Sequence, residues 1–159
     1  LAKSLGSHVT AVCSTRNITL VQSLGADEVI DYTKTDFVKG GARFDVMMDM
    51  VGNRSLSDCK QVLSAGGRYV PCSGGGGDWL GPVMRIIGCQ LTFLFGGKHA
   101  RMFIQKLNAA DLVVMRELID SGAIRPVIDR IWSFSEVSAA LQHVGTGHSQ
   151  GLNIIRISS

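Results

Sequence analysis

The sequence predicts an α/β fold with a doubly wound parallel sheet. Short apolar or β-branched segments alternate with segments of helical periodicity, glycines stand where most of these segments end, and one central segment is almost continuously apolar. Parallel neighbours require crossover connections, which the intervening helices supply. With 45% hydrophobic and 18% charged residues in a chain of 159, the composition is that of one globular domain with an appendage.

The spacing of apolar residues gives the amino-terminal elements. His8–Cys13 predicts a strand, and apolar residues three positions apart in Ile18–Leu24 predict a helix that stops at Gly25. Glu28–Tyr32 predicts the next strand. The end of a helix, but no Gly-rich turn, precedes the first of these strands, so we expect a sheet that lacks its first strand.

One buried strand marks the centre of the chain. Phe44–Val51 is almost continuously apolar, which is typical of a parallel strand covered on both faces, and Gly52 ends it. Asn53 or Ser55 then caps a helix. Arg68–Cys72 predicts the strand that follows, directly before a run of glycines.

The last part of the predicted sheet comes from an apolar segment that divides at Gly88. Leu80–Ile87 predicts a short helix and Cys89–Phe95 a strand. Arg85 makes a membrane span of this segment unfavourable by about 2.5 to 3.5 kcal/mol on insertion scales. Asp111–Ser121 then predicts a helix. A return segment follows it: a strand over Pro126–Trp132, a helix over Glu136–Val144 with Ser135 as its N-cap, and a closing strand over Gly151–Ile157.

Charge and cysteine content exclude several classes of function. The net charge is +3, and Lys and Arg are scattered without interleaved aromatic residues, so the sequence predicts no nucleic-acid interface. The four cysteines form no C-x-x-C motif, and they stand in or beside apolar segments as reduced core thiols do. The histidines have no metal-ligand spacing. We expect a cytoplasmic protein that binds a small molecule, without a metal site or contact with nucleic acid or membrane.

Five short motifs carry a resemblance to a known family. They are Leu24–Tyr32 with the sequence LGADEVIDY, Asp49–Gly52 with the sequence DMVG, Gly66–Arg68, Ile124–Asp129 and Gly147–Gly151. Each is weak alone, but their order and spacing extend over almost the whole chain. The sequence resembles the medium-chain dehydrogenase/reductase superfamily, in its quinone-oxidoreductase-like branch of the zinc-binding-dehydrogenase type.

The resemblance implies a domain organisation and an activity. It makes residues 1–97 an incomplete dinucleotide-binding domain, Rossmann-like but without its first strand, residues 98–125 a connecting helical segment, and residues 126–159 the carboxyl-terminal part of a substrate domain. The implied function is that of a fragment of an NADPH-dependent oxidoreductase that reduces a quinone or an activated alkene or carbonyl compound. We expect the fragment alone to be inactive. A non-catalytic truncated fragment or interaction module is the alternative hypothesis.

The polar cluster after the first strand has two interpretations. Hydroxyls of Ser14 and Thr15 with Arg16, and no acid, suit the 2′-phosphate of NADP(H), whereas enzymes selective for NAD(H) place Asp or Glu at this strand end. The resemblance places Tyr32 near the same phosphate. Alternatively, Ser14 and Thr15 cap the next helix and Arg16 is a solvated surface residue. We favour phosphate binding because the cluster lies between a strand and a helix.

Small residues follow two further strands. Val51 and Gly52, and likewise Ser73 and Gly74, stand at the carboxyl ends of strands, where ligands bind in open α/β sheets. The resemblance implies that these turns approach the ribose and the nicotinamide through backbone atoms. Simple turn chemistry is the alternative interpretation.

The segment Leu91–Phe95 has two expected roles. As an apolar edge strand it has unpaired backbone groups, so we predict a homodimer through this edge. The resemblance places Phe93 and Phe95 beside the nicotinamide, with an ordinary core strand as the alternative. We expect no catalytic side chain here, because the cofactor supplies the hydride and the protein supplies position and electrostatics.

Overall fold

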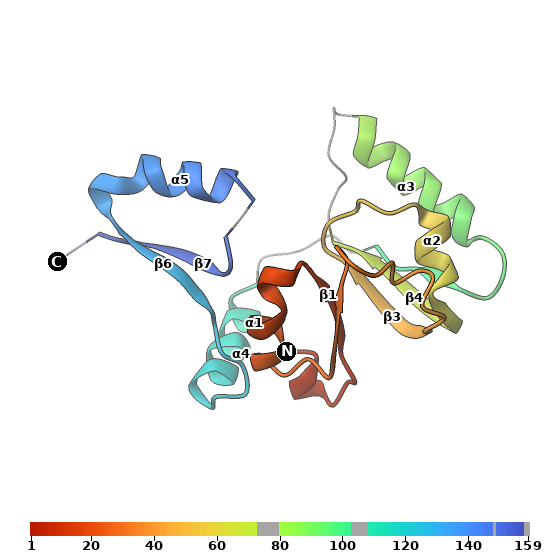
Figure 1. Cartoon of the computed structure of the whole chain (residues 1–159), viewed down its shortest axis with the longest axis horizontal. Helices are drawn as coiled ribbons and strands as arrows, with labels where there is room; N and C mark the ends of the chain where they lie inside the picture. Colours follow the sequence, from red (N-terminus) through yellow and green to blue (C-terminus); the bar gives the residue numbers. More distant parts are fainter. Residues whose placement is uncertain (73–79, 103–107, 148, 158–159) are drawn as a thin grey trace. The chain divides into compact units, whose positions relative to one another are not determined.

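The computed structural model describes residues 1–72, 80–102, 108–147 and 149–157. The chain divides into two compact units (Figure 1), one of Leu1–Asp31 with Leu107–Ser159 and one of Tyr32–Lys106. All strand pairs in the described residues are parallel, and helices connect most of them. The predicted α/β class with parallel strands is therefore confirmed.

The amino-terminal part of the first unit is a strand-helix-strand arrangement. After η1 (Lys3–Leu5), β1 (Thr10–Cys13) leads into the short η2 (Thr15–Asn17) and α1 (Ile18–Ser23). β2 (Glu28–Asp31) then returns parallel to β1. The register pairs the last residue of β1 with the last residue of β2, so the carboxyl ends of the two strands lie side by side.

The carboxyl-terminal part of the first unit contains the predicted helix and return segment. β6 and β7 pair in parallel, and a helix connects them. The elements are α4 (Ala109–Asp120), β6 (Ile128–Ser133), η3 (Phe134–Glu136), α5 (Val137–Gly145) and β7 (Leu152–Arg156).

The residue that caps the turn leading into α5 differs from the prediction. Ser133, not Ser135, is the N-cap, and it forms a capping box with Glu136. The Glu136 carboxylate accepts hydrogen bonds from the backbone N–H of Ser133 at 2.9 Å and from its hydroxyl at 2.7 Å. The pattern Ser-x-x-Glu begins at Ser133, whereas Ser135 has only Ser138 three residues later, so the box selects the earlier serine.

The second unit is a three-stranded parallel sheet in the order β3-β4-β5, with two helices. Of the two residues predicted to cap the first helix, Ser55 does so, because its hydroxyl accepts the backbone N–H of Asp58 at 3.1 Å. The elements are β3 (Phe44–Asp49), α2 (Leu56–Gln61), β4 (Leu63–Pro71), α3 (Leu80–Phe93) and β5 (His99–Ala100).

The predicted strand over Cys89–Phe95 is wrong, since α3 runs through to Phe93 as one helix. Arg85, Cys89 and Phe93 are four positions apart and so share one helical face. Cys89 and Phe93 are buried, and the Phe93 ring stacks on Tyr69 with centroids 5.5 Å apart. These contacts hold the segment as a helix.

Three of the apolar residues that made this segment resemble a strand are exposed. Leu91 lies on an exposed face of α3, and Leu94 and Phe95 follow the end of the helix, so none of them belongs to a strand buried in a sheet. The outer strand of the described sheet beside β4 is instead the short β5. The predicted edge strand at Leu91–Phe95 is therefore corrected to β5.

The strands form three separate sheets in the described residues, not one. β1 pairs with β2 in the first unit, and β3 pairs with β4 in the second.

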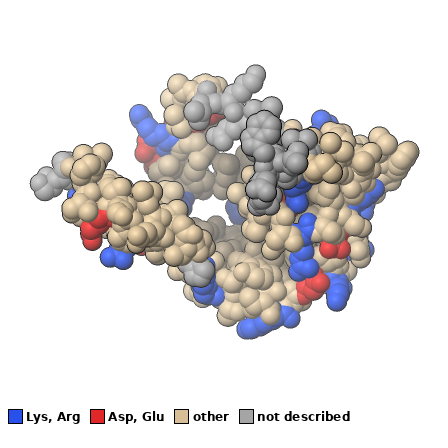
Figure 2. All heavy atoms as spheres, turned by 90° about the horizontal axis from the view of Figure 1, so that it is seen from above, with Lys and Arg blue, Asp and Glu red and all other residues tan. Residues whose placement is uncertain are grey.

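The surface shows scattered positive charge. Figure 2 shows Lys and Arg spread over the visible face, with single acidic residues among them, rather than gathered in one patch. The four cysteines are free. Among the described residues, no helix has the length and apolar character needed to span a bilayer.

Candidate functional site

Two turns at the carboxyl ends of strands are the candidate ligand-binding features. One is η2, which follows β1 in the first unit, and the other is Met50–Gly52, which follows β3 in the second unit. Ligands of open parallel sheets bind at such strand ends.

In the first turn, the predicted polar cluster meets an acid from the neighbouring strand. The Thr15 hydroxyl donates a hydrogen bond of 2.5 Å to the Asp31 carboxylate. Ser14 has extended backbone geometry and makes no side-chain capping bond, so its hydroxyl does not have the capping role of the alternative interpretation. Arg16 is exposed. Two hydroxyls, a cation and a carboxylate thus gather at the ends of β1 and β2.

Asp31 is a residue of this turn that was not predicted from the sequence. No acid directly follows β1, as expected, but an acid comes from the end of β2. The parallel register places Asp31 opposite Cys13, one residue before the cluster begins. A register derived from the two predicted strands would have revealed this neighbour.

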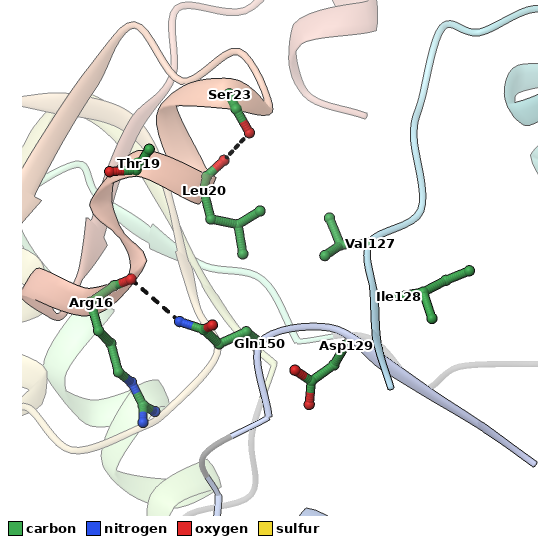
Figure 3. Close-up of a pocket in the computed structure, with 8 residues that line it drawn as sticks. All are labelled: Arg16, Thr19, Leu20, Ser23, Val127, Ile128, Asp129 and Gln150. Atoms are coloured by element: carbon green, nitrogen blue, oxygen red, sulfur yellow. Dashed lines mark hydrogen bonds between the residues drawn. The ribbon is translucent and has the colours of Figure 1, made fainter. Parts of the chain in front are cut away.

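A pocket of about 490 Å³ lies beside the first turn (Figure 3). The Gln150 side-chain amide donates to the Arg16 carbonyl at 3.3 Å and to the Asn17 side-chain oxygen at 2.6 Å. These bonds fix the turn to a residue more than 130 positions later in the chain. The pocket is lined by Arg16, Thr19, Leu20, Ser23, Val127, Ile128, Asp129 and Gln150.

Asp129, which lines this pocket, is already engaged. Its carboxylate lies 2.8 Å from His143 Nε2. The hydrogen bond to His143 lowers the pKa of Asp129, with help from the backbone of Gln150 and the side chain of Asn153. The pair therefore joins β6 to α5, and Asp129 is not a free acid.

In the second turn, Asp49 accepts four hydrogen bonds. Its Oδ1 accepts the backbone N–H groups of Gly52 at 2.7 Å and Val51 at 3.2 Å. Its Oδ2 accepts the Tyr69 hydroxyl at 2.7 Å and the Arg85 guanidinium at 3.0 Å. The carboxylate at the end of β3 thus shapes the turn and joins it to β4 and α3.

The same network fixes the ionisation of its members. Burial alone would raise the pKa of Asp49, but hydrogen bonds from Tyr69 and from the turn amides, with the charge of Arg85, lower it. Burial and the adjacent Asp49 raise the pKa of Tyr69, so the phenol stays protonated and donates a hydrogen bond to Asp49. Asp49 is consequently an ionised structural acceptor, not a general acid.

The other predicted site residues have varied surroundings. Tyr32 follows Asp31 directly and is exposed. Val51 is exposed beside Gly52, whose φ of +73° is the left-handed conformation that glycine adopts without strain. Phe93 is buried, while Phe95 is 77% exposed.

The strand on which the assignments of Phe93 and Phe95 rested is a helix that ends at Phe93. Ser73 and Gly74 lie outside the described residues. The sequence analysis missed Tyr69 and Arg85 because they are about 20 and 36 residues from Asp49 and no motif joins them.

Comparison with known proteins identifies the family of this chain. A family model described as zinc-binding dehydrogenase matches residues 24–155, which is most of the chain. This chain belongs to the zinc-binding dehydrogenase family. The resemblance inferred from the five motifs is therefore confirmed.

The relatives in this family are oxidoreductases by name. The chain is 35% identical over 170 residues to the mitochondrial NAD(P)H oxidoreductase RTN4IP1 of Mus musculus, covering 98% of this chain and 43% of that protein. It is 32% identical over 174 residues to the trans-enoyl reductase pgmF of Aspergillus terreus, covering 99% of this chain and 47% of that protein. The chain thus spans less than half the length of these relatives.

A solved structure shares the fold. The quinone oxidoreductase from Coxiella burnetii matches with a TM-score of 0.80 and 22% identity, over 99% of this chain and 47% of that chain. The family name includes zinc, but among the described residues no group of three or more His, Cys, Asp or Glu side chains is arranged to hold a metal ion. The residues described here do not fit a zinc site.

Proposed function

We propose that the chain forms the cofactor-binding part of an NADPH-dependent oxidoreductase that reduces a quinone or an activated alkene or carbonyl compound by hydride transfer. Membership of the family and the names of its relatives support the proposal. The observation that carries it is the Val51–Gly52 turn, which stands at the carboxyl end of a parallel strand and is anchored by a buried Asp-Tyr-Arg network.

The groups present fit the parts of a nicotinamide dinucleotide. The hydroxyls of Ser14 and Thr15 and the Arg16 guanidinium suit a phosphorylated ribose, since a hydrogen bond between charged groups contributes about 1.5 to 3 kcal/mol. Tyr32, directly after Asp31, offers an aromatic face and a hydroxyl. The backbone of Val51 and Gly52 suits close approach of the nicotinamide ribose.

The cofactor, when bound, supplies the hydride, and the residues of this chain bind and orient it. No side chain among the described residues is assigned to proton transfer. The carboxylate nearest the second turn, Asp49, is saturated with donors and has a lowered pKa, which supports this division of roles. The substrate class rests on the names of the relatives.

The experiment is a reductase assay on the full natural polypeptide that contains this chain. Oxidation of NADPH and of NADH is followed separately, with a quinone and with an α,β-unsaturated ketone as acceptors. We expect turnover of at least one acceptor, with NADPH preferred. A folded polypeptide that binds neither cofactor would contradict the proposal and favour a non-catalytic module.

The cytoplasmic location stays a prediction, and relatives include proteins named mitochondrial and chloroplastic.

A further inference from the structure

We propose that Arg85 is a positioning residue for the cofactor, acting from α3 through the Val51–Gly52 turn. This inference rests on the proposed function, because it assumes that the turn faces the nicotinamide half of the dinucleotide. Arg85 itself is partly buried beneath the turn, with 17% of its side chain exposed. It therefore acts through the backbone that it holds rather than by touching the cofactor.

Arg85 holds the turn by bonds that begin at two of its nitrogens. One terminal nitrogen donates to the Gly52 carbonyl at 3.2 Å. The other donates to the Asp49 carboxylate at 3.0 Å and to the Tyr69 hydroxyl at 2.6 Å. The guanidinium thus bridges the backbone of the turn, the end of β3 and the middle of β4.

The turn is restrained at both its donors and its acceptor. Asp49 accepts the N–H groups of Val51 and Gly52, and Arg85 donates to the carbonyl of Gly52. Gly52 has a φ of +73°. A glycine that is not restrained can adopt many other backbone conformations, so these bonds hold Gly52 in this one. Loss of Arg85 would leave the carbonyl of Gly52 free to rotate.

The cost of this arrangement indicates a role beyond packing. The Arg85 Nε is buried and has no hydrogen-bond partner among the described residues. An unpaired buried donor is destabilising, and such groups are rare in native structures. An apolar residue would fill the same space between α3 and β4 without this penalty. Only a planar fork reaches the turn carbonyl, the carboxylate and the phenol together.

The test measures two ligands on the full natural polypeptide and its Arg85→Met variant. NADPH contains the nicotinamide half that the Val51–Gly52 turn is proposed to bind. Adenosine 2′,5′-bisphosphate lacks that half and contains only the phosphorylated ribose assigned to Ser14, Thr15 and Arg16. We expect Arg85→Met to weaken NADPH binding by roughly tenfold, the equivalent of one charge-assisted hydrogen bond, and to leave bisphosphate binding unchanged. A role in stability alone would move neither affinity in a variant that remains folded.

Two further variants keep the test decisive if Arg85→Met does not fold. Arg85→Lys retains the charge beside Asp49 but cannot form the fork, so we expect it to fold and to restore NADPH binding only in part. Tyr69→Phe retains the ring that stacks on Phe93 and removes only the hydroxyl, with a smaller loss expected. Arg116→Met is the matched control, because Arg116 is exposed on α4 and pairs only with Asp120 in the described ion pairs.

The outcomes separate this inference from the proposed function. If the wild-type polypeptide does not bind NADPH, both fail. If the wild type binds NADPH and the folded Arg85 variants bind it equally well, the proposed function stands and the positioning role of Arg85 is wrong. An equal loss of NADPH and bisphosphate binding would also overturn it, because the effect would then not be specific to the turn.

Discussion

The Thr15 hydroxyl donates a hydrogen bond to the Asp31 carboxylate and so joins the end of β1 to the end of β2. This places an acid beside the cluster that contains Arg16. Arg16 favours a 2′-phosphate, whereas a carboxylate favours the free ribose hydroxyls of NAD(H) and repels a phosphate. The proposed preference for NADPH therefore depends on the balance between a cation and an anion at one strand end.

The first prediction concerns Arg16. Arg16→Ala in the full natural polypeptide should weaken NADPH binding by more than about tenfold, because it removes a charge-assisted hydrogen bond, and should change NADH binding little. Titration with each cofactor measures the effect. Arg116→Ala, on exposed α4, is the control and should alter neither affinity. Equal losses for both cofactors would count against assigning Arg16 to the phosphate.

The second prediction concerns Asp31. Asp31→Asn removes the negative charge but keeps an oxygen that accepts the Thr15 hydroxyl. NADPH affinity should rise, by roughly fivefold at most because the site is exposed, and the gain should shrink as salt is added. Titrations at low and high ionic strength measure it. If NADPH binding instead falls, Asp31 does not oppose the phosphate and serves mainly to hold Thr15.

The alternation of strands and helices was predictable from the spacing of apolar residues. Phe44–Val51 predicts a parallel strand, and β3 ends at Asp49, within two residues of the predicted end. The predicted burial on both faces is wrong in the described residues, because β3 is the outer strand of its sheet and exposes Val46 and Met48. The strand predicted over Cys89–Phe95 is wrong: Leu91 in α3 and Leu94 and Phe95 just after it are exposed, so they carry no information about a sheet. The residues of this segment that α3 buries are Cys89 and Phe93, four positions apart. Their helical spacing could not be recognised in the sequence because most of the residues around them are apolar too.

The candidate site was predictable only in its local part. The turns after β1 and β3 follow from strand ends and small or polar residues, which lie together in sequence. Asp31, Tyr69 and Arg85 reach these turns through pairing of strands and packing of a helix. Such partners depend on register and on helix orientation, neither of which any single segment determines.

The third prediction concerns acid stability. The pKa of Asp49 is lowered in the folded protein, so its contribution to stability is complete above the unfolded value of about 3.9 and is lost as the pH falls through the lower folded value. Asp49→Asn should lower the melting temperature at neutral pH and flatten its decline in acid. Thermal unfolding from neutral to acidic pH measures both. Asp120→Asn, at an exposed ion pair, should change the melting temperature little.

The fourth prediction concerns a glycine at the start of β7. A Cβ at Gly151 would lie 2.5 Å from the Val127 carbonyl oxygen, which accepts the backbone N–H of Leu152 at 2.8 Å. Gly151→Ala should therefore destabilise the fold by about 1 to 3 kcal/mol through overpacking. Gly145→Ala is the control: a Cβ there meets nothing within 4 Å, and alanine in α5 should stabilise by about 0.5 to 1 kcal/mol. Urea unfolding distinguishes them, and equal stabilities would show that the backbone at Gly151 adjusts freely.

The last prediction concerns the proposed homodimer. The short β5 is the outer strand beside β4, and three exposed apolar residues lie close to it in sequence: Leu91 in α3, and Leu94 and Phe95 just after that helix. An unpaired strand edge and an apolar patch both favour association with a second copy. We therefore expect light scattering to detect a dimer or larger species, and Leu91→Glu to weaken it by burying a charge at the contact. Leu112→Glu is the matched control, since Leu112 is 68% exposed and Leu91 67%, but on α4 in the other unit. A wild-type monomer at high concentration, or equal weakening by both variants, would contradict association through this edge.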